Sequence, residues 1–291
     1  MTVTIRSADL AATIDPHGAE LVSLRDAEGR ELMTDADPAF WTGHAPLLFP
    51  VVGKPAGETI RVDRRAYPMK QHGFARRRDF APVAEAADRV TFRLVDDAET
   101  RAAYPFAFRL DATYALAGAT LTIEVVVANP ADTPLSASFG FHPAFAWPLP
   151  YGAPRAAHRI VFAADEPEPL RRLAADGTIA PGSRPSPLDG RTLALDDALF
   201  AQDALVWDAI RSRSVRYGAP GTPQLDIAFD APMLGVWTKP GARFVCIEPW
   251  HGLADPEGYT GPFEDKPGVF TVAPGGEKRI VMTVSLLPSD T

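Results

Sequence analysis

Glu248 is the residue whose type and position first suggest chemistry. It lies in VCIEPWHGLAD (Val245–Asp255), at the end of an alternating apolar run and directly before Pro249. This pattern predicts a strand that ends at Pro249, because proline has no amide hydrogen to continue a ladder. A carboxylate at the end of a buried strand costs free energy unless it is paired, hydrogen-bonded or held in a pocket for chemistry. From this segment alone, a salt-bridged strand end and a functional carboxylate are both open.

His142 repeats this arrangement in a second segment, LSASFGFHPAFAWPL (Leu135–Leu149). Large apolar residues alternate there with small ones, which predicts a strand with His142 at its end on the small, polar face. His142 also precedes a proline and an aromatic residue. We expect the two strand ends to meet over one sheet, with His142 and Glu248 lining one cavity from opposite sides of a bound ring. A structural histidine is the weaker alternative.

A third motif, QHGFAR (Gln71–Arg76), places His72 and Arg76 on one tight segment. Both side chains can donate hydrogen bonds to the oxygen atoms of a polar ligand. An ordinary surface loop is the alternative for a lone His-Gly pair. The presence of two donors favours a binding role.

Strands are the elements expected to carry these residues. The 29 prolines and 22 glycines are spread along the chain, which is typical of short strands joined by turns. Phe106–Asn129 predicts a long hairpin around Ala117-Gly118-Ala119, and Asp97–Tyr104 a single helical turn before Pro105. No break in composition divides the sequence. We therefore expect residues 1–291 to form a single all-β, mainly antiparallel sandwich domain.

Composition excludes several classes of partner. The net charge is −8 and the one dense basic run is Arg76–Arg78, so we expect no nucleic acid. Cys246 is the single cysteine, which fits a reducing compartment, and its apolar surroundings indicate an inert buried thiol. The sequence lacks a signal-peptide pattern and an apolar run of the ~20 residues that a membrane helix needs. We expect a cytoplasmic monomer or homodimer without membrane contact.

Taken together, the motifs resemble the aldose 1-epimerase (galactose mutarotase) family. The resemblance covers essentially the whole chain and rests on QHGFAR, on GFHPAF (Gly140–Phe145), on the segment Asp203–Tyr217 and on VCIEPWHGLAD. Each motif is short, but four in the family's order form a fairly specific signal. The resemblance implies a β-supersandwich of two large sheets that binds a sugar on a concave surface.

The resemblance also implies roles for individual residues. Glu248 looks like the family's general base and His142 like its general acid. His72 looks like the second active-site histidine, which contacts the sugar. Asp203 looks like the sugar-binding aspartate, although Asp208 competes for that role. We further expect Arg76, Lys54 and Trp250 to contact the sugar, with Trp41 or Phe74 as other candidates for stacking on the ring.

The implied reaction interconverts the α and β anomers of a free aldose. A base removes the anomeric proton while an acid protonates the ring oxygen, so the ring opens; rotation about C1–C2 and closure complete the cycle. For this, Glu248 is expected to be ionised and His142 protonated, with the carboxylate raising the histidine pKa. No metal or redox cofactor is required. The protein is thus predicted to be a cofactor-independent isomerase that acts on a small sugar.

One departure from the family pattern bears on the substrate. Typical galactose mutarotases carry an arginine upstream of the first histidine, where this chain has Lys54, and here Arg76 follows His72 instead. This pattern is closer to a less characterised branch, so galactose itself is not implied. Two alternatives stay open. One is a hexose-6-phosphate mutarotase that uses Arg76–Arg78 and Lys54 as a phosphate clamp. The other is a non-catalytic, carbohydrate-binding or regulatory protein of the same fold.

Overall fold

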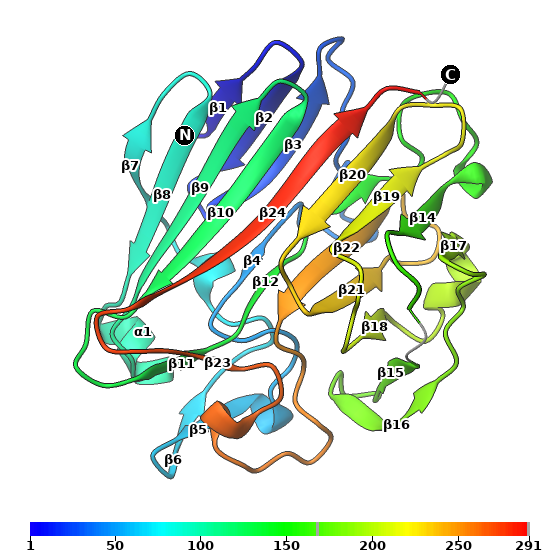
Figure 1. The fold of residues 1–291 in the computed structure, drawn as a ribbon. Helices are drawn as coiled ribbons and strands as arrows, with labels where there is room; N and C mark the ends of the chain where they lie inside the picture. Colours follow the sequence, from blue (N-terminus) through cyan, green and yellow to red (C-terminus); the bar gives the residue numbers. More distant parts are fainter. Residues whose placement is uncertain (167–168, 290–291) are drawn as a thin grey trace.

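Two large antiparallel sheets dominate the computed structural model, which describes residues 1–166 and 169–289 (Figure 1). We call them the β9–β10 sheet and the β22 sheet, after central strands. Over the described residues, α1 (Ala98–Ala103) is the one α-helix. The expected all-β, mainly antiparallel architecture is therefore confirmed.

Within the described ranges the β9–β10 sheet has nine strands. In spatial order they are β17 (Thr192–Ala194), β14 (Arg159–Phe162), β19 (Ser214–Gly218), β20 (Gln224–Phe229), β24 (Glu277–Leu287), β10 (Thr120–Ala128), β9 (Arg109–Ala117), β8 (Arg89–Val95) and β7 (Ala81–Glu85). The β22 sheet orders β16 (Ile179–Arg184), β15 (Leu170–Leu173), β18 (Leu205–Trp207), β21 (Met233–Trp237), β22 (Phe244–His251), β12 (Phe139–Phe141) and β4 (Leu47–Leu48), and β13 (Ala144–Ala146) also pairs with β22.

Smaller elements surround the two sheets. They are the β1 (Val3–Arg6), β2 (Leu10–Asp15) and β3 (Glu20–Asp26) sheet, the β5 (Thr59–Val62) and β6 (Arg65–Pro68) hairpin, and the pair β11 (Leu135–Ala137) and β23 (Phe270–Val272). Short 3₁₀ turns are η1 (Ala56–Glu58), η2 (Ala75–Arg77), η3 (Arg155–Ala157), η4 (Asp197–Phe200) and η5 (Phe263–Asp265). In Figure 1, β5 and β6 lie at the lower end of the molecule, as do β15 and β16.

Alternation of side chains decides which face of each sheet meets the main core. In β9, Leu110, Ala112, Tyr114 and Leu116 are buried and join one hydrophobic cluster with the inward residues of β10 and β24. Val245 and Ile247 of β22 belong to that same cluster, so they lie between the two sheets. Because successive strand residues point to opposite faces, Cys246 and Glu248 lie on the side of the β22 sheet away from this core.

The sequence-based expectations for local elements hold in several places. The predicted hairpin is β9–β10, paired from Arg109↔Ala128 to Ala117↔Thr120 around Gly118 and Ala119. The predicted helical turn is α1, which begins with a capping box between Asp97 and Thr100 and ends before Pro105. No helix within the described residues is long and apolar enough to span a bilayer.

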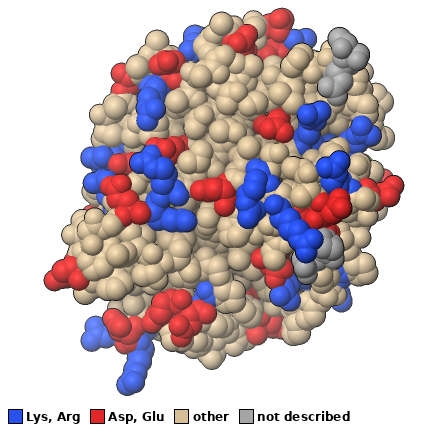
Figure 2. All heavy atoms as spheres, viewed as in Figure 1, with Lys and Arg blue, Asp and Glu red and all other residues tan. Residues whose placement is uncertain are grey.

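Charged side chains of both signs mix on the molecular face that Figure 2 shows, so that face has no large area of one sign. Many of them pair across strands of the β9–β10 sheet: Arg93 with Asp111 at 2.7 Å, Arg109 with Glu277 at 2.6 Å, and Arg279 with Glu124. Such partly exposed pairs contribute little to stability individually.

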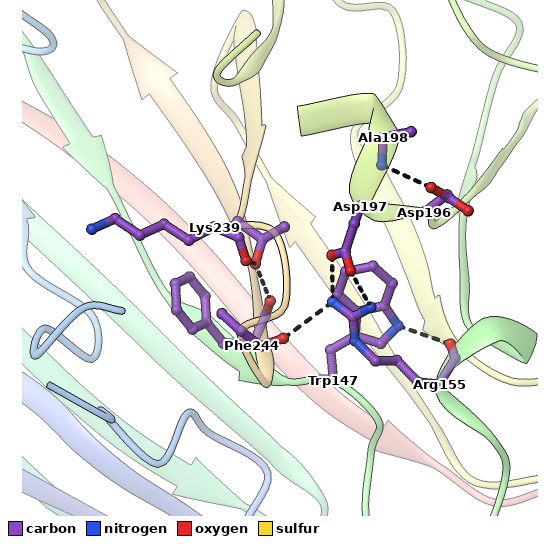
Figure 3. A network of polar contacts seen from close by, with 9 residues as sticks. Trp147, Arg155, Asp196, Asp197, Ala198, Lys239 and Phe244 are labelled. Atoms are coloured by element: carbon purple, nitrogen blue, oxygen red, sulfur yellow. Dashed lines mark hydrogen bonds and ion pairs between the residues drawn. The ribbon is translucent and has the colours of Figure 1, made fainter. Parts of the chain in front are cut away.

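A network around Arg155 holds the turn that joins β21 to β22 (Figure 3). The Arg155 guanidinium makes two hydrogen bonds to the Asp197 carboxylate, at 3.0 and 2.7 Å, and lies 3.4 Å from the centre of the Trp147 ring. It also donates to the backbone oxygen of Ala242 in the turn, at 3.1 Å. The ends of β21 and β22 are thereby tied to η3 and η4.

We predict that Arg155→Met lowers the free energy of unfolding by about 1–3 kcal/mol, because charged hydrogen bonds and an aromatic contact are lost together. Urea denaturation followed by circular dichroism measures this change. Arg279→Met is the matched control, since its side chain is 58% exposed and its loss is expected to cost less than about 1 kcal/mol. Equal losses in the two variants would contradict a special role for the Arg155 network.

Candidate active site

A cavity opens on the side of the β22 sheet away from the main core. Its empty volume is about 880 Å³, part of which is open to solvent. Six of the seven predicted site residues line it: His72, Arg76, His142, Asp203, Glu248 and Trp250. Residues from four separate sequence segments therefore converge on one cavity.

His142 and Glu248 are in direct contact in this cavity. His142 Nε2 lies 3.1 Å from Glu248 Oε2, and the two side chains are 8% and 2% exposed. The expectation that they face each other across a bound ring was wrong. They lie side by side, because β12 and β22 are neighbouring strands with Gly140 opposite Trp250.

The course of β22 also differs from the prediction, since the strand continues through Pro249 to His251. Ile247 N–H donates to Pro143 O at 3.2 Å, on the side of β22 that faces β12 and β13. The register of β22 with β12 and β13 is continuous, from Phe139↔His251 to Ala146↔Phe244, so Pro249 lies opposite Phe141 in it. On its other side β22 pairs with β21, where Pro249 is opposite Leu234, and the strand continues past the missing amide hydrogen. Glu248 consequently lies inside a strand and not at its end.

Burial determines the protonation of the pair. It raises the pKa of Glu248 well above the usual carboxyl range, and the nearby Asp203 charge adds to the rise, while Trp250 acts in the opposite direction. Burial lowers the pKa of His142 to about 3, and the Arg76 charge acts in the same direction. The expected rise in the His142 pKa was wrong, because burial lowers it. Both pKa shifts favour the neutral carboxyl and the neutral imidazole over an ionised pair.

His72 is held by backbone geometry beside this pair. Its φ is +63°, its N–H donates to Gly53 O at 2.9 Å, and its Nδ1 accepts from Gly53 N–H at 3.2 Å. The ring meets that of His142 edge-to-face, with centroids 5.6 Å apart. Burial and the charges of His142 and Arg76 keep its pKa well below the usual value. His72 Nε2 lies 3.2 Å from the side-chain amide nitrogen of Gln71.

The two aspartates that competed in the sequence are separated by the fold. Asp203 lines the cavity, with φ +70°, and its carboxylate accepts from Ala204 N–H at 2.8 Å. Asp208 is engaged by Arg171 at 2.5 Å and is absent from the described cavity wall. Only Asp203 is therefore placed to meet a ligand of this cavity.

The three arginines of Arg76–Arg78 also differ in position, since one of them lines the cavity and two bond elsewhere. Arg76 lines the cavity, where burial and the Arg77 charge lower its pKa. Arg77 donates to Gly73 O at 2.8 Å, and Arg78 pairs with Asp97 and with Glu99. The three arginines thus do not converge on one ligand.

Lys54 is the predicted site residue that does not line the cavity within the described residues. Its backbone oxygen accepts from Asp255 N–H at 2.9 Å. Hydrogen bonds from Thr178 lower the pKa of the exposed Asp176, and the Lys54 charge acts in the same direction. The loop conformation fixed by the Asp255 contact thus leaves the side chain beside the turn that contains Asp176.

Aromatic side chains form much of the remaining wall, and sequence reasoning found them only in part. Trp41 lies over His142 with ring centroids 5.1 Å apart, and Trp237 meets Trp41 edge-on at 5.6 Å. Trp237 was missed, although it is in register with Cys246 on the strand next to Glu248. Phe74, proposed for stacking, instead packs against Phe49, Tyr104 and Phe108 in the core.

A buried ion pair fixes the loops at the rim. Lys266 Nζ lies 2.7 Å from Asp255 Oδ1, and the side chains are 1% and 5% exposed. Asp255 Oδ2 accepts from Ala56 N–H at 2.9 Å, and Asp255 O accepts from Ile179 N–H at 2.8 Å. This pair links the Gly53–Ala56 loop that holds His72 to the edge of β16.

With the geometry established, comparison with known proteins gives the family. The sequence matches the family described as aldose 1-epimerase over residues 1–204. The plasmid-encoded Protein LacX of Lactococcus lactis subsp. lactis is 30% identical over 285 residues, which cover 94% of this chain and 95% of LacX.

Solved structures agree with this match. A galactose mutarotase related enzyme from Lactobacillus acidophilus has a TM-score of 0.90 and 30% identity over 100% of this chain and 99% of its own. A galactose mutarotase-like protein from Lactobacillus casei ATCC 334 has a TM-score of 0.89 and 28% identity over 99% of this chain and 100% of its own. The chain belongs to the aldose 1-epimerase family, and its fold is galactose mutarotase-like.

Two glycines leave the space that Trp250 occupies in the cavity wall. A Cβ on Gly235 would lie 2.4 Å from the Trp250 ring, and one on Gly140 would lie 2.6 Å from it. We predict that Gly235→Ala displaces the indole, lowers the free energy of unfolding by about 1–3 kcal/mol and changes the near-ultraviolet circular dichroism.

Gly221→Ala is the control for this variant. Its φ of +74° strains any L side chain, but no atom lies within 4 Å of an added Cβ. It is expected to lose stability without altering the tryptophan signal. An unchanged spectrum and unfolding curve for Gly235→Ala would contradict the description of the wall.

Proposed function

We propose that the protein is an aldose 1-epimerase, a cofactor-independent isomerase that interconverts the α and β anomers of an aldohexose. The observation that carries this proposal is the contact of His142 with Glu248 on the wall of a cavity of sugar size. Family membership and the likeness to a galactose mutarotase related enzyme support it.

In the proposed reaction the pair moves one proton in each direction. The Glu248 carboxylate removes the proton of the anomeric hydroxyl while the His142 imidazolium protonates the ring oxygen, and the C1–O5 bond breaks. After rotation about C1–C2, closure reverses both transfers. The two sugar oxygens are bonded to the same carbon, so an acid and a base that lie side by side can serve both.

The neutral pair of the ligand-free site is compatible with this cycle. The neutral and ionised forms differ by transfer of one proton between Nε2 and Oε2, and both carry the single proton that the cycle requires. Hydroxyl groups of a bound sugar that donate to Glu248 favour its carboxylate form. His72, Arg76 and Asp203 are proposed to bind sugar hydroxyls, and Trp250 to contact the ring.

Neither alternative function is favoured by a specific observation. A phosphate clamp needs several cations, whereas among the described residues Arg76 is the one member of Arg76–Arg78 and Lys54 that lines the cavity. A sugar-binding protein without turnover would not need a buried acid–base pair in contact. Sugar binding in calorimetry without anomer exchange would support that function.

Removal of either partner is expected to abolish most of the activity. We predict that Glu248→Gln and His142→Ala each lower kcat/KM by about 10²–10⁴-fold, the usual contribution of a general acid or base. Polarimetry of freshly dissolved α-glucose and α-galactose, corrected for spontaneous exchange, measures this. Glu277→Gln, which changes an exposed surface carboxylate, is the control with unchanged activity. Wild-type rates in the two cavity variants would contradict the proposal.

The pH dependence follows from the shared proton. At low pH the pair gains a second proton through the lowered pKa of His142, about 3, and at high pH it loses its only proton through the raised pKa of Glu248. We therefore expect kcat/KM to be level across neutral pH, with an acid limb near pH 3 and an alkaline limb well above the usual carboxyl range.

The opposite result is a pH profile of kcat/KM whose two limbs lie at about 4.3 and 6.5, the usual pKa values of glutamate and histidine. It would show an ionised glutamate and a protonated histidine that titrate independently. Circular dichroism at each pH confirms that the chain is folded.

A further inference from the structure

Three buried side chains at the base of the cavity form a group that the proposed reaction uses only in part. His142 and Glu248 line the cavity, whereas Cys246 is not part of the described cavity wall. One ligand atom each from His142, Cys246 and Glu248 lies within 4.8 Å of the others. Cys246 and Glu248 are two residues apart on the same face of β22, and His142 comes from the break between β12 and β13. Cys246 is a free thiol without exposed surface.

Two polar atoms of this group lack a hydrogen-bond partner and can therefore bind a ligand. Glu248 Oε2 and His142 Nδ1 are buried and have no hydrogen-bond partner among the described residues. Buried polar atoms are nearly always satisfied, so atoms without a partner in a cavity wall indicate a ligand. A bound sugar can form hydrogen bonds with His142 and Glu248. It does not explain why the Cys246 thiol lies beside them.

The set of sulfur, nitrogen and oxygen donors fits Zn²⁺. Zinc binds cysteine thiolate, histidine nitrogen and carboxylate oxygen, often with three protein ligands and one open position. Donor atoms in such a site lie about 3.5 Å apart, so these side chains need to approach by about 1 Å. The cavity reaches His142 and Glu248, which line it, and so provides an entry path to two of the three ligands.

Charge balance supports the same metal. A thiolate and a carboxylate together neutralise Zn²⁺, and the imidazole binds metal in its neutral form, so the occupied site has no net charge. This matters because an unbalanced charge in a dry site is costly. Metal binding deprotonates the thiol and releases its proton to solvent.

We propose that His142, Cys246 and Glu248 form a Zn²⁺ site at the base of the cavity, and that Zn²⁺ inhibits the protein by occupying both members of the acid–base pair. Binding is independent of the proposed function, whereas inhibition rests on it. Variants of Cys246 can test metal binding separately from catalysis, because the proposed reaction does not use this residue.

Direct binding is the first test, with the untagged full chain and ZnCl₂ in calorimetry. We expect one site per chain, and about 100-fold or greater weakening in Cys246→Ala and in Cys246→Ser, since loss of a ligand exceeds the effect of losing an outer contact. Near-ultraviolet circular dichroism confirms that both variants keep the wild-type fold. Equal Zn²⁺ affinity in the wild type and both variants, or no binding to the wild type, would overturn the proposal.

Cobalt gives a spectroscopic test of the ligand set. Co²⁺ bound to a thiolate produces a sulfur-to-metal charge-transfer band, and Cys246 is the single cysteine of the chain, so the band reports on this site alone. We expect the band in the wild type and its absence in Cys246→Ser. Mg²⁺ prefers oxygen ligands and should not displace Co²⁺. A missing band, or displacement by Mg²⁺, would count against the site.

Inhibition is the final test. Zn²⁺ is expected to raise the apparent KM for anomer exchange in the wild type, and Cys246→Ala should keep its rate while losing this sensitivity. Equal inhibition of both proteins would place the inhibitory metal elsewhere. If the chain does not exchange anomers at all, the proposed function fails while the calorimetric and cobalt results still decide on the metal site.

Discussion

The structure depends on keeping two ionisable groups dry and in contact. His142 and Glu248 are almost fully buried and lie 3.1 Å apart, so each loses the hydration that would stabilise its charge. This burial raises the pKa of Glu248 and lowers that of His142, which favours the neutral form of each group. Such a pair can give and take a proton with little change in net charge, which suits a reaction that moves protons between two oxygens of one sugar carbon.

The strand register of the β22 sheet creates this arrangement. β22 pairs with β12 and β13 in one continuous register, from Phe139↔His251 to Ala146↔Phe244, which places His142 directly opposite Glu248. Gly140 and Gly235 make space for Trp250. The opposite face of the same strand carries Val245 and Ile247 in the main core. One strand thus anchors the site to the sandwich and presents its chemistry.

Much of the fold was predictable because strand patterns are local. The β9–β10 hairpin, α1 and the motifs around His72, His142 and Glu248 follow from alternation, turn residues and proline positions. Features that depend on the surroundings were not predictable. Pro249 appeared to end β22, since nothing in the sequence shows that pairing with β21 and β12 carries the strand on to His251. Trp237 enters the wall through its register with Cys246. Lys54 lies near Gly177, but it is not part of the described cavity wall. The charges of the pair depend on burial, which only the folded chain defines.

The central claim is that His142 and Glu248 act together on the anomeric carbon, and a crystal structure with a bound aldose tests it most directly. The account predicts that the anomeric and ring oxygens lie within about 3.2 Å of the Glu248 carboxyl group and His142 Nε2. A sugar bound elsewhere on the chain, or one whose C1 oxygens lie beyond hydrogen-bonding reach of both side chains, would contradict it.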